Sequence, residues 1–182
     1  RNGRIKRLED TNGDGLMDKV TVFVDGLNLP RMILPLDDRI AVRETDTMDI
    51  FSYRDTDGDG VADQKELLYK RGSYGRGNNQ SVEHQDSGLM WNLDNHIYLS
   101  YNIERYRFTD RTWKAEKQRG HWTQWGLTHN EVGDVYWAHN SDPVAAPYLH
   151  PRYLGTVQRL AGKEVFGTAI DMGKPYAPDF MK

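Results

Sequence analysis

The chain has 182 residues, of which 37% are hydrophobic and 28% charged, and these proportions are ordinary for a soluble globular protein. Its net charge of −3 gives no reason to expect a nucleic acid or an anionic membrane as a partner. It contains no cysteine, which excludes disulfides, thiolate zinc sites, cysteine nucleophiles and a CxxCH haem attachment within these residues.

The predicted elements are short β-strands. Val20, Val22 and Val24 recur at every second position, which is the period of a strand. Further β-branched or aromatic runs predict strands over Met48–Tyr53, Ile97–Tyr101 and Val135–Ala138, and a hairpin over Tyr106–Trp113. Asp63–Lys70 is the one stretch whose pattern favours a turn of helix.

The sequence repeats itself. Ile5–Leu27 aligns with Ile50–Gly72, and the acidic loops of the two segments match without a gap, so that Asp55 follows Asp10 by 45 residues. A second pair of similar segments begins at Gly88 (GLMWNLDNHIYLSY) and Gly126 (GLTHNEVGDVYWAH). A spacing of about 40 to 45 residues with several short strands per unit is typical of propeller blades. The repeats therefore predict an all-β fold, and specifically a β-propeller.

The predicted propeller is incomplete within this chain. Its length corresponds to about four blades, whereas a closed ring commonly has more, about six to eight. The sequence also begins without an initiator Met, as if inside a strand. We therefore expect residues 1–182 to form part of a single propeller domain in a longer chain. A β-sandwich is the alternative fold.

Two acidic loops predict calcium sites, because calcium takes six to eight oxygen ligands and alternating carboxylates with glycines supply them. The predicted ligands of the second loop are Asp55, Asp57, Asp59, the Val61 carbonyl, Asp63 and Glu66. Those of the first loop are Asp10, Asn12, Asp14, the Leu16 carbonyl and Asp18. Thr21 occupies the last position of the first loop, so Asp18 must close that site.

The segments beside the loops are strand-like, which argues against EF-hands, where helices would flank the loop. Both loops are therefore expected to connect the strands of hairpins and to rigidify them. The alternative is that they are polar turns, since Asp-Gly is a common turn dipeptide. Loops of this kind suit millimolar calcium, which indicates a periplasmic or extracellular location.

A third segment, GNNQSVEHQDSGLMWNLDNHIYLSY from Gly77, contains His84, and a histidine can act as a base near neutral pH. It resembles the HxxGxLxxxxDxxIY motif of soluble PQQ-dependent sugar dehydrogenases, which are six-bladed propellers that bind calcium. The resemblance implies that His84 is the general base, although one extra residue precedes Gly88. The arginines and lysine that hold the cofactor in that family lie in later blades, which this chain does not clearly contain. Arg76 is the candidate here for contact with an anionic cofactor.

A closer resemblance covers most of the chain. RLEDTNGDGLMDKVTVFVDGLNLP, FSYRDTDGDGVADQKELL and GNNQ…GLMWNLDNHIY are similar to the N-terminal propeller of large planctomycete-type proteins named as membrane-bound dehydrogenases. These proteins continue into helical repeats and a C-terminal cytochrome c domain. The resemblance thus implies haem c in a domain outside this chain. Separately, no apolar run of the sequence approaches the roughly 18 residues of a membrane span, so none is expected in this segment.

Three functions follow from these observations. The leading hypothesis is a quinoprotein-like dehydrogenase that oxidises a sugar or alcohol hydroxyl, with His84 as base and PQQ as hydride acceptor. The second is a propeller polysaccharide lyase that acts on uronates. The third is a non-catalytic, calcium-stabilised module that binds a glycan, a cytochrome c domain or another subunit. For His84 and Arg76 the alternative is an ordinary loop residue, hydrogen-bonded or solvated.

Overall fold

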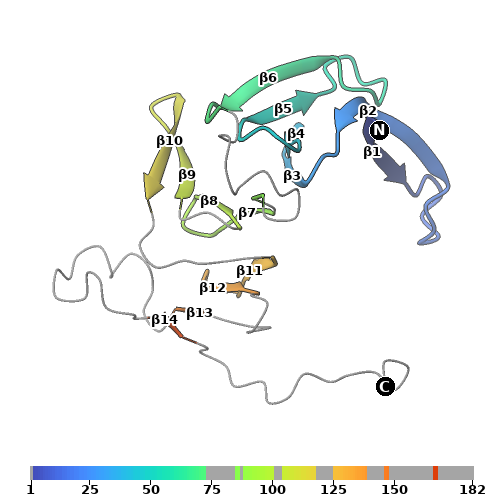
Figure 1. Ribbon diagram of the computed structural model, residues 1–182. Coiled ribbons are helices and arrows are strands. Elements are labelled where there is room, and N and C mark those ends of the chain that lie inside the picture. The colour runs from blue at the N-terminus through green and yellow to red at the C-terminus, as the bar shows by residue number, and fades with distance from the viewer. Residues whose placement is uncertain are drawn as a thin grey trace, which may run out of the picture. The chain divides into compact units, whose positions relative to one another are not determined.

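The computed structural model describes residues 2–72, 85–86, 88–100, 104–117, 125–138, 146–147 and 166–167. These residues are all-β, in small antiparallel sheets (Figure 1), and contain no helix, so the all-β part of the predicted fold is confirmed. A helix able to span a membrane is likewise missing from this part of the chain.

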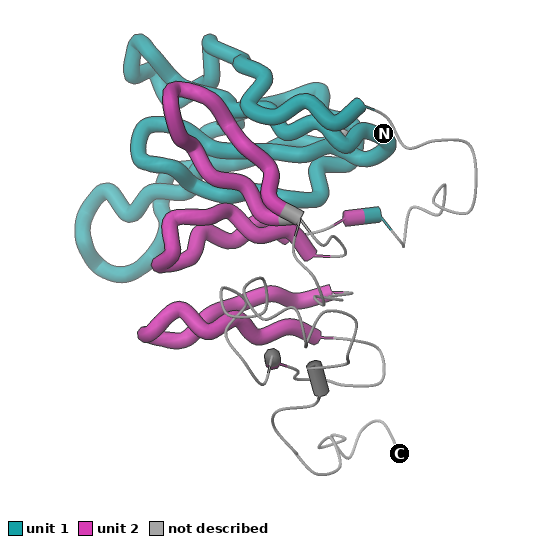
Figure 2. Tube along the Cα trace, turned by 90° about the vertical axis from the view of Figure 1, so that its left-hand side faces the viewer, with its two compact units in different colours: residues 1–85 teal, residues 86–182 magenta. Residues whose placement is uncertain are grey.

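The strands are short, at two to ten residues each. In chain order they are β1 (Asn2–Glu9), β2 (Lys19–Asn28), β3 (Met32–Leu36), β4 (Arg39–Arg43), β5 (Ile50–Arg54), β6 (Gln64–Tyr69), β7 (Leu89–Trp91), β8 (Ile97–Leu99), β9 (Glu104–Thr109), β10 (Thr112–Lys117), β11 (Leu127–His129), β12 (Val135–Trp137), β13 (Ala146–Pro147) and β14 (Phe166–Gly167). They divide between two compact units, Arg1–Gln85 and Asp86–Lys182 (Figure 2).

The first unit contains a four-stranded sheet and a hairpin. The sheet has its strands in chain order, β3-β4-β5-β6, with every neighbour antiparallel, and the hairpin pairs β1 with β2. The two are joined by one apolar core, whose buried members are Ile5, Val24, Leu27, Val42 and Tyr53. The core residues come from both sheets, so burial of apolar surface holds hairpin and sheet together.

The loop between β5 and β6 also packs against the hairpin. The Ala62 N–H donates to the carbonyl of Phe23 in β2 over 2.8 Å. Gly60, with φ +92°, lies so close to Thr21 that a Cβ atom added to it would be 3.3 Å from the threonine Cγ2. The loop therefore has a tertiary contact in addition to its role as a turn.

The second unit repeats this plan. Strands β7 to β10 form a four-stranded antiparallel sheet in chain order, and β11 pairs with β12. Tyr98, Val135 and Trp137 form the buried core between them. The side-chain amide of Asn92, fully buried in the β7–β8 turn, donates to the carbonyl of Gly133 in the β11–β12 turn over 2.9 Å.

The predicted strand at Val20–Val24 lies within β2, and the four other predicted strand regions also contain strands. The helical turn expected over Asp63–Lys70 is wrong, because Gln64–Tyr69 is strand β6. The local sequence QKELLY suits a helix, but its backbone completes a ladder with β5, in which Glu66 pairs with Ser52. Tertiary pairing here overrides local propensity.

The two loop glycines Gly15 and Gly60 offer a matched test of the loop packing. Both have positive φ, +89° and +92°, so alanine at either position is expected to cost about 1–3 kcal/mol of backbone strain. Only the Cβ of Gly60→Ala would press on Thr21, and Gly15 has open space. Gly60→Ala should therefore lower the free energy of urea unfolding by at least about 1 kcal/mol more than Gly15→Ala. Equal losses would contradict the packing.

Candidate metal centres

The acidic loops connect β1 to β2 and β5 to β6, at equivalent places in the repeat. Each chain reversal needs two glycines with positive φ, a conformation that glycine adopts at little cost. They are Gly13 and Gly15 in the first loop and Gly58 and Gly60 in the second. The DxxGxG spacing of the sequence thus has a direct conformational cause.

The first carboxylate of each loop is the anchor of the turn. Asp10 accepts hydrogen bonds from the backbone N–H groups of Gly13 (2.7 Å) and Gly15 (2.8 Å). Asp55 accepts the equivalent bonds from Gly58 (2.7 Å) and Gly60 (2.9 Å). Both carboxylates are therefore held toward the inside of the turn.

The following acidic positions continue the pattern. Asp57 accepts from the N–H of Asp59 over 3.2 Å, and Asp59 accepts from the N–H of Val61 over 2.7 Å. Together with Asp55 they form a group whose carboxylate oxygens, one from each residue, all lie within 4.8 Å of one another. In the first loop Asn12 and Asp14 make the same backbone contacts, with Asn12 accepting over 2.9 Å and Asp14 over 2.8 Å.

The predicted ligands Asp18 and Asp63 also have a second role. The Asp18 carboxylate accepts from the N–H (2.9 Å) and hydroxyl (2.7 Å) of Thr11, and Asp63 accepts from the same two groups of Thr56. Each pair ties the end of its loop to the beginning. The sequence signal of this contact is the threonine that follows the first Asp of both repeats, which the calcium-loop motif does not include.

Glu66, the last predicted ligand of the second loop, is engaged elsewhere. It lies in β6, and its carboxylate accepts from Arg39 Nη1 (3.3 Å) and Gln64 Nε2 (3.0 Å). The group that the structure brings together is therefore Asp55, Asp57 and Asp59, with the Val61 carbonyl next to them in sequence.

Hydrogen bonds keep the loop carboxylates anionic. The N–H groups of Gly15 and Gly13 hold the pKa of Asp10 below the ordinary aspartate value of 3.8. Desolvation acts to raise the pKa of Asp55, but bonds from Gly60 and Gly58 outweigh it and lower the value. The Thr11 and Thr56 hydroxyls lower the pKa of Asp18 and Asp63 in the same way. At neutral pH both loops therefore present several negative charges.

The residues proposed for redox chemistry, His84 and Arg76, lie outside the described residues. Their roles as base and as cofactor contact stay predictions.

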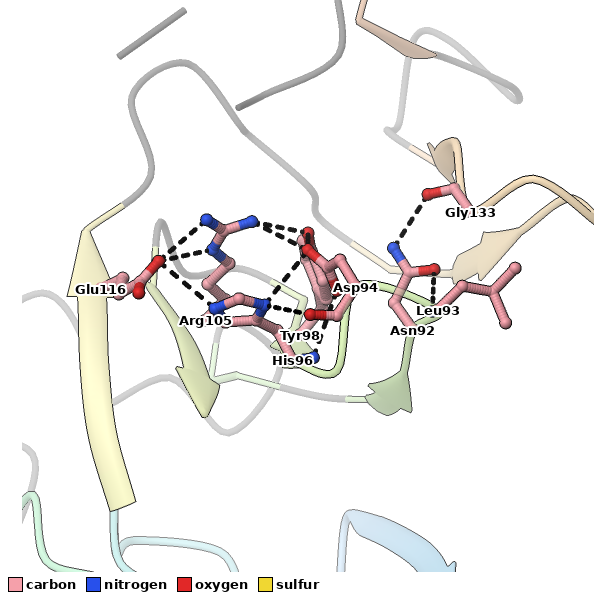
Figure 3. Close-up of polar contacts among 8 residues, drawn as sticks. All are labelled: Asn92, Leu93, Asp94, His96, Tyr98, Arg105, Glu116 and Gly133. Carbon is pink, nitrogen blue, oxygen red and sulfur yellow. Dashed lines mark hydrogen bonds and ion pairs between the residues drawn. The ribbon is translucent and has the colours of Figure 1, made fainter. Parts of the chain in front are cut away.

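A second polar cluster lies in the β7–β10 sheet (Figure 3), and sequence analysis did not identify it. Asp94, in the β7–β8 turn, accepts from the Tyr98 hydroxyl (2.7 Å) and from Arg105 Nη1 (2.9 Å). Arg105 also donates from Nε (3.0 Å) and Nη2 (2.8 Å) to Glu116 in β10. A single guanidinium thus joins two carboxylates across three strands and a turn.

His96 completes this cluster and is only 5% exposed. Its Nδ1 lies 2.9 Å from the carbonyl oxygen of Asp94, which can only accept, so Nδ1 carries a proton. Its Nε2 lies 3.3 Å from Glu116 Oε2 but outside hydrogen-bond geometry, and it is buried without another partner. The imidazole therefore fills the space between the two carboxylates and fixes the turn.

The chain was compared with models of known protein families, and one of them matches. A family model described as a domain of unknown function, DUF7133, matches residues 1–173. The chain belongs to the DUF7133 family. Searches of curated proteins and of solved structures found no match. Membership of the DUF7133 family therefore assigns no activity to the chain, and a function can be inferred only from its residues.

The pKa shifts in this DUF7133 cluster support a structural role. Burial raises the pKa of Tyr98, and its bond to Asp94 adds to the effect, so the phenol stays a donor at neutral pH. Desolvation acts to raise the pKa of Glu116, but Arg105 outweighs it and lowers the value. At neutral pH Tyr98 thus keeps the proton that it donates, and Glu116 stays ionised as an acceptor.

The cluster predicts unequal effects of two truncations. Asp94→Ala leaves Arg105, whose side chain is 16% exposed, and the buried Tyr98 hydroxyl short of an acceptor, which should cost about 1–3 kcal/mol of folding stability. Glu116 is 48% exposed, so water replaces it more easily, and Glu116→Ala should cost less than about 1 kcal/mol. Urea unfolding of both variants measures the difference. A larger loss for Glu116→Ala would contradict this account.

Proposed function

We propose that this DUF7133 chain is a calcium-binding segment of a β-propeller, in which the two acidic loops hold the cations. The observation that carries the proposal is the convergence of the Asp55, Asp57 and Asp59 carboxylates within 4.8 Å of one another. Asp10, Asn12 and Asp14 share the same backbone contacts, so the first loop is the second candidate site.

The charge balance supports a cation from outside the chain. Among the residues that the structure describes, no lysine or arginine forms an ion pair with an aspartate of either loop. Carboxylates at this spacing repel one another unless a positive charge lies between them. The donors are oxygens, without thiolate or imidazole, which favours calcium over zinc or copper.

The strand order supports the propeller. Two antiparallel sheets, β3 to β6 and β7 to β10, each have four strands in chain order, as a blade does. The β1–β2 hairpin corresponds to β5–β6, and β11–β12 corresponds to β7–β8, so the chain contains parts of four blades. Since the second loop contacts β2, a bound cation would rigidify the contact between one blade and the next. This role suits a calcium-rich location outside the cytoplasm.

The two loops differ at their third position, Asn12 against Asp57, and this difference gives a reciprocal test. A carboxylate adds charge to the site, so Asp57→Asn should weaken calcium binding at the second loop by about tenfold, and Asn12→Asp should strengthen it at the first. Isothermal titration of calcium into metal-free protein measures both. We expect two calcium sites in the unaltered chain. In an Asp10→Ala, Asp55→Ala double variant, which keeps all the loop glycines, the heat of calcium binding should vanish. The absence of calcium binding at millimolar concentration would refute the proposal.

The dehydrogenase function is a separate proposal that rests on the family resemblance at His84. In it, His84 would accept the proton of a sugar or alcohol hydroxyl, and PQQ would supply the electron-accepting chemistry. The runner-up proposals are the uronate lyase and the non-catalytic binding module.

Adding PQQ and calcium to the purified protein tests the redox proposal. We expect a change in quinone absorbance on binding and dye reduction with a sugar, with dye reduction abolished and absorbance change kept in His84→Gln. His129→Gln, in β11, is the control and should retain both signals. Without any absorbance change the dehydrogenase proposal fails, while calcium binding is unaffected. A rise in ultraviolet absorbance with uronate polymers would favour the lyase instead.

A further inference from the structure

Three equivalent positions differ in burial between the two acidic-loop repeats. In the second repeat, Tyr53 is 5% exposed, Gly60 is buried and Ala62 is half-buried. In the first repeat, the residues 45 positions earlier are Leu8 (56% exposed), Gly15 (exposed) and Met17 (58% exposed). We call these three residues of the first repeat the loop-1 face. An apolar face is thus covered in one copy of the repeat and uncovered in the other.

The second repeat shows what covers this face. Ala62 donates its N–H to the Phe23 carbonyl of β2, and Gly60 lies against Thr21 of the same strand. Tyr53 belongs to the core that includes Val24, also in β2. The cover is therefore the outer strand of the preceding acidic-loop hairpin, which contributes a carbonyl, a small β-branched residue and an apolar side chain.

In the first repeat the equivalent N–H donor and the equivalent space beside the glycine are present, but no described strand covers them. The Met17 N–H has no hydrogen-bond partner among the described residues, and a Cβ added to Gly15 would meet nothing within 4 Å. The neighbouring Leu16 and its equivalent Val61 are both exposed, at 70% and 45%. Other pairs, such as Arg7 and Ser52, also differ in burial, because β5 pairs with β4 on its other side whereas β1 pairs only with β2. At Gly15 and Met17 the difference instead follows the contact that Gly60 and Ala62 make with β2.

We propose that the loop-1 face docks on the outer strand of a further hairpin of the same repeat, as the second loop docks on β2. The proposal rests on the propeller function proposed above, because it treats each acidic loop as a contact between consecutive blades. The docked strand would accept the Met17 N–H with a backbone carbonyl and cover Leu8 with an apolar side chain.

Other occupants fit less well. The same loop carries the carboxylates of Asp10 and Asp14, and this negative charge disfavours an anionic lipid surface. On β2 of a second copy, the Phe23 carbonyl already accepts a bond from Ala62. The equivalent strand β6 of a second copy is tested by the concentration dependence described below. A β2-like strand whose carbonyl is free meets both requirements.

Amide hydrogen exchange tests the docking one bond at a time, since exchange rates follow local opening. The comparison is between residues 1–182 and the full natural protein, both saturated with calcium. We expect the Met17 amide to exchange fast in residues 1–182 and at least about tenfold more slowly in the full protein. The Ala62 amide should be slow in both. Asp18, which donates to the Glu9 carbonyl within its own hairpin, is the internal control and should also be slow in both.

Equal, fast exchange of Met17 in both proteins would overturn the proposal. Slowing in residues 1–182 that depends on protein concentration would also overturn it, because a second copy would then be the cover. Calcium titration separates this failure from that of the proposed function: binding at both loops with an unprotected Met17 amide refutes only the docking.

A matched pair of variants gives a second measurement. Met17→Ser removes an apolar side chain from the docked face, so it should lower the melting temperature of the full protein by several degrees and leave that of residues 1–182 within about 1 °C. Val132→Ser, at an exposed apolar residue of the β11–β12 turn, is the control and should change neither melting temperature. Equal effects of Met17→Ser on the two proteins would contradict the docking.

Discussion

The acidic loops depend on one constraint, the pair of hydrogen bonds from glycine N–H groups to the first carboxylate. Asp55 can accept from both Gly58 and Gly60 only because the two glycines adopt positive φ. The same turn points the Asp57 and Asp59 carboxylates toward Asp55 and brings Ala62 to the edge of β2. Hairpin geometry, the candidate cation site and the tertiary contact thus follow from one local arrangement.

The hairpin of β9 and β10 reverses the chain by different means. Between β9 and β10 only Asp110 and Arg111 form the turn, both with positive φ, and the Lys114 ammonium lies 2.6 Å from the Asp110 carboxylate. A two-residue turn of this kind suits the twist of paired strands. A nine-residue acidic loop is therefore not needed to connect these strands, so its presence in the other two hairpins calls for another explanation, such as a ligand.

The sequence predicted most of this local structure and little of the long-range chemistry. Alternating valines, loop glycines and the repeat of 45 residues indicated strands and hairpins, because their causes are local. The strand at Gln64–Tyr69 was missed because its pairing partner β5, not its own composition, determines its conformation. The cluster around Arg105 was missed for the same reason, since Asp94 and Glu116 each lie 11 residues away from it and meet it only in the folded sheet.

The two polar clusters differ in whether a side chain of the described residues supplies a positive charge between the carboxylates. In the β7–β10 sheet two carboxylates, Asp94 and Glu116, face each other across a guanidinium that the chain itself provides. In the second loop three carboxylates converge, and the described chain places no cation among them. Backbone N–H groups lower the pKa of Asp55, so protonation at neutral pH does not remove the charge. In the function proposed above, a cation from solution balances this charge, and the hard oxygen donors favour calcium for that role.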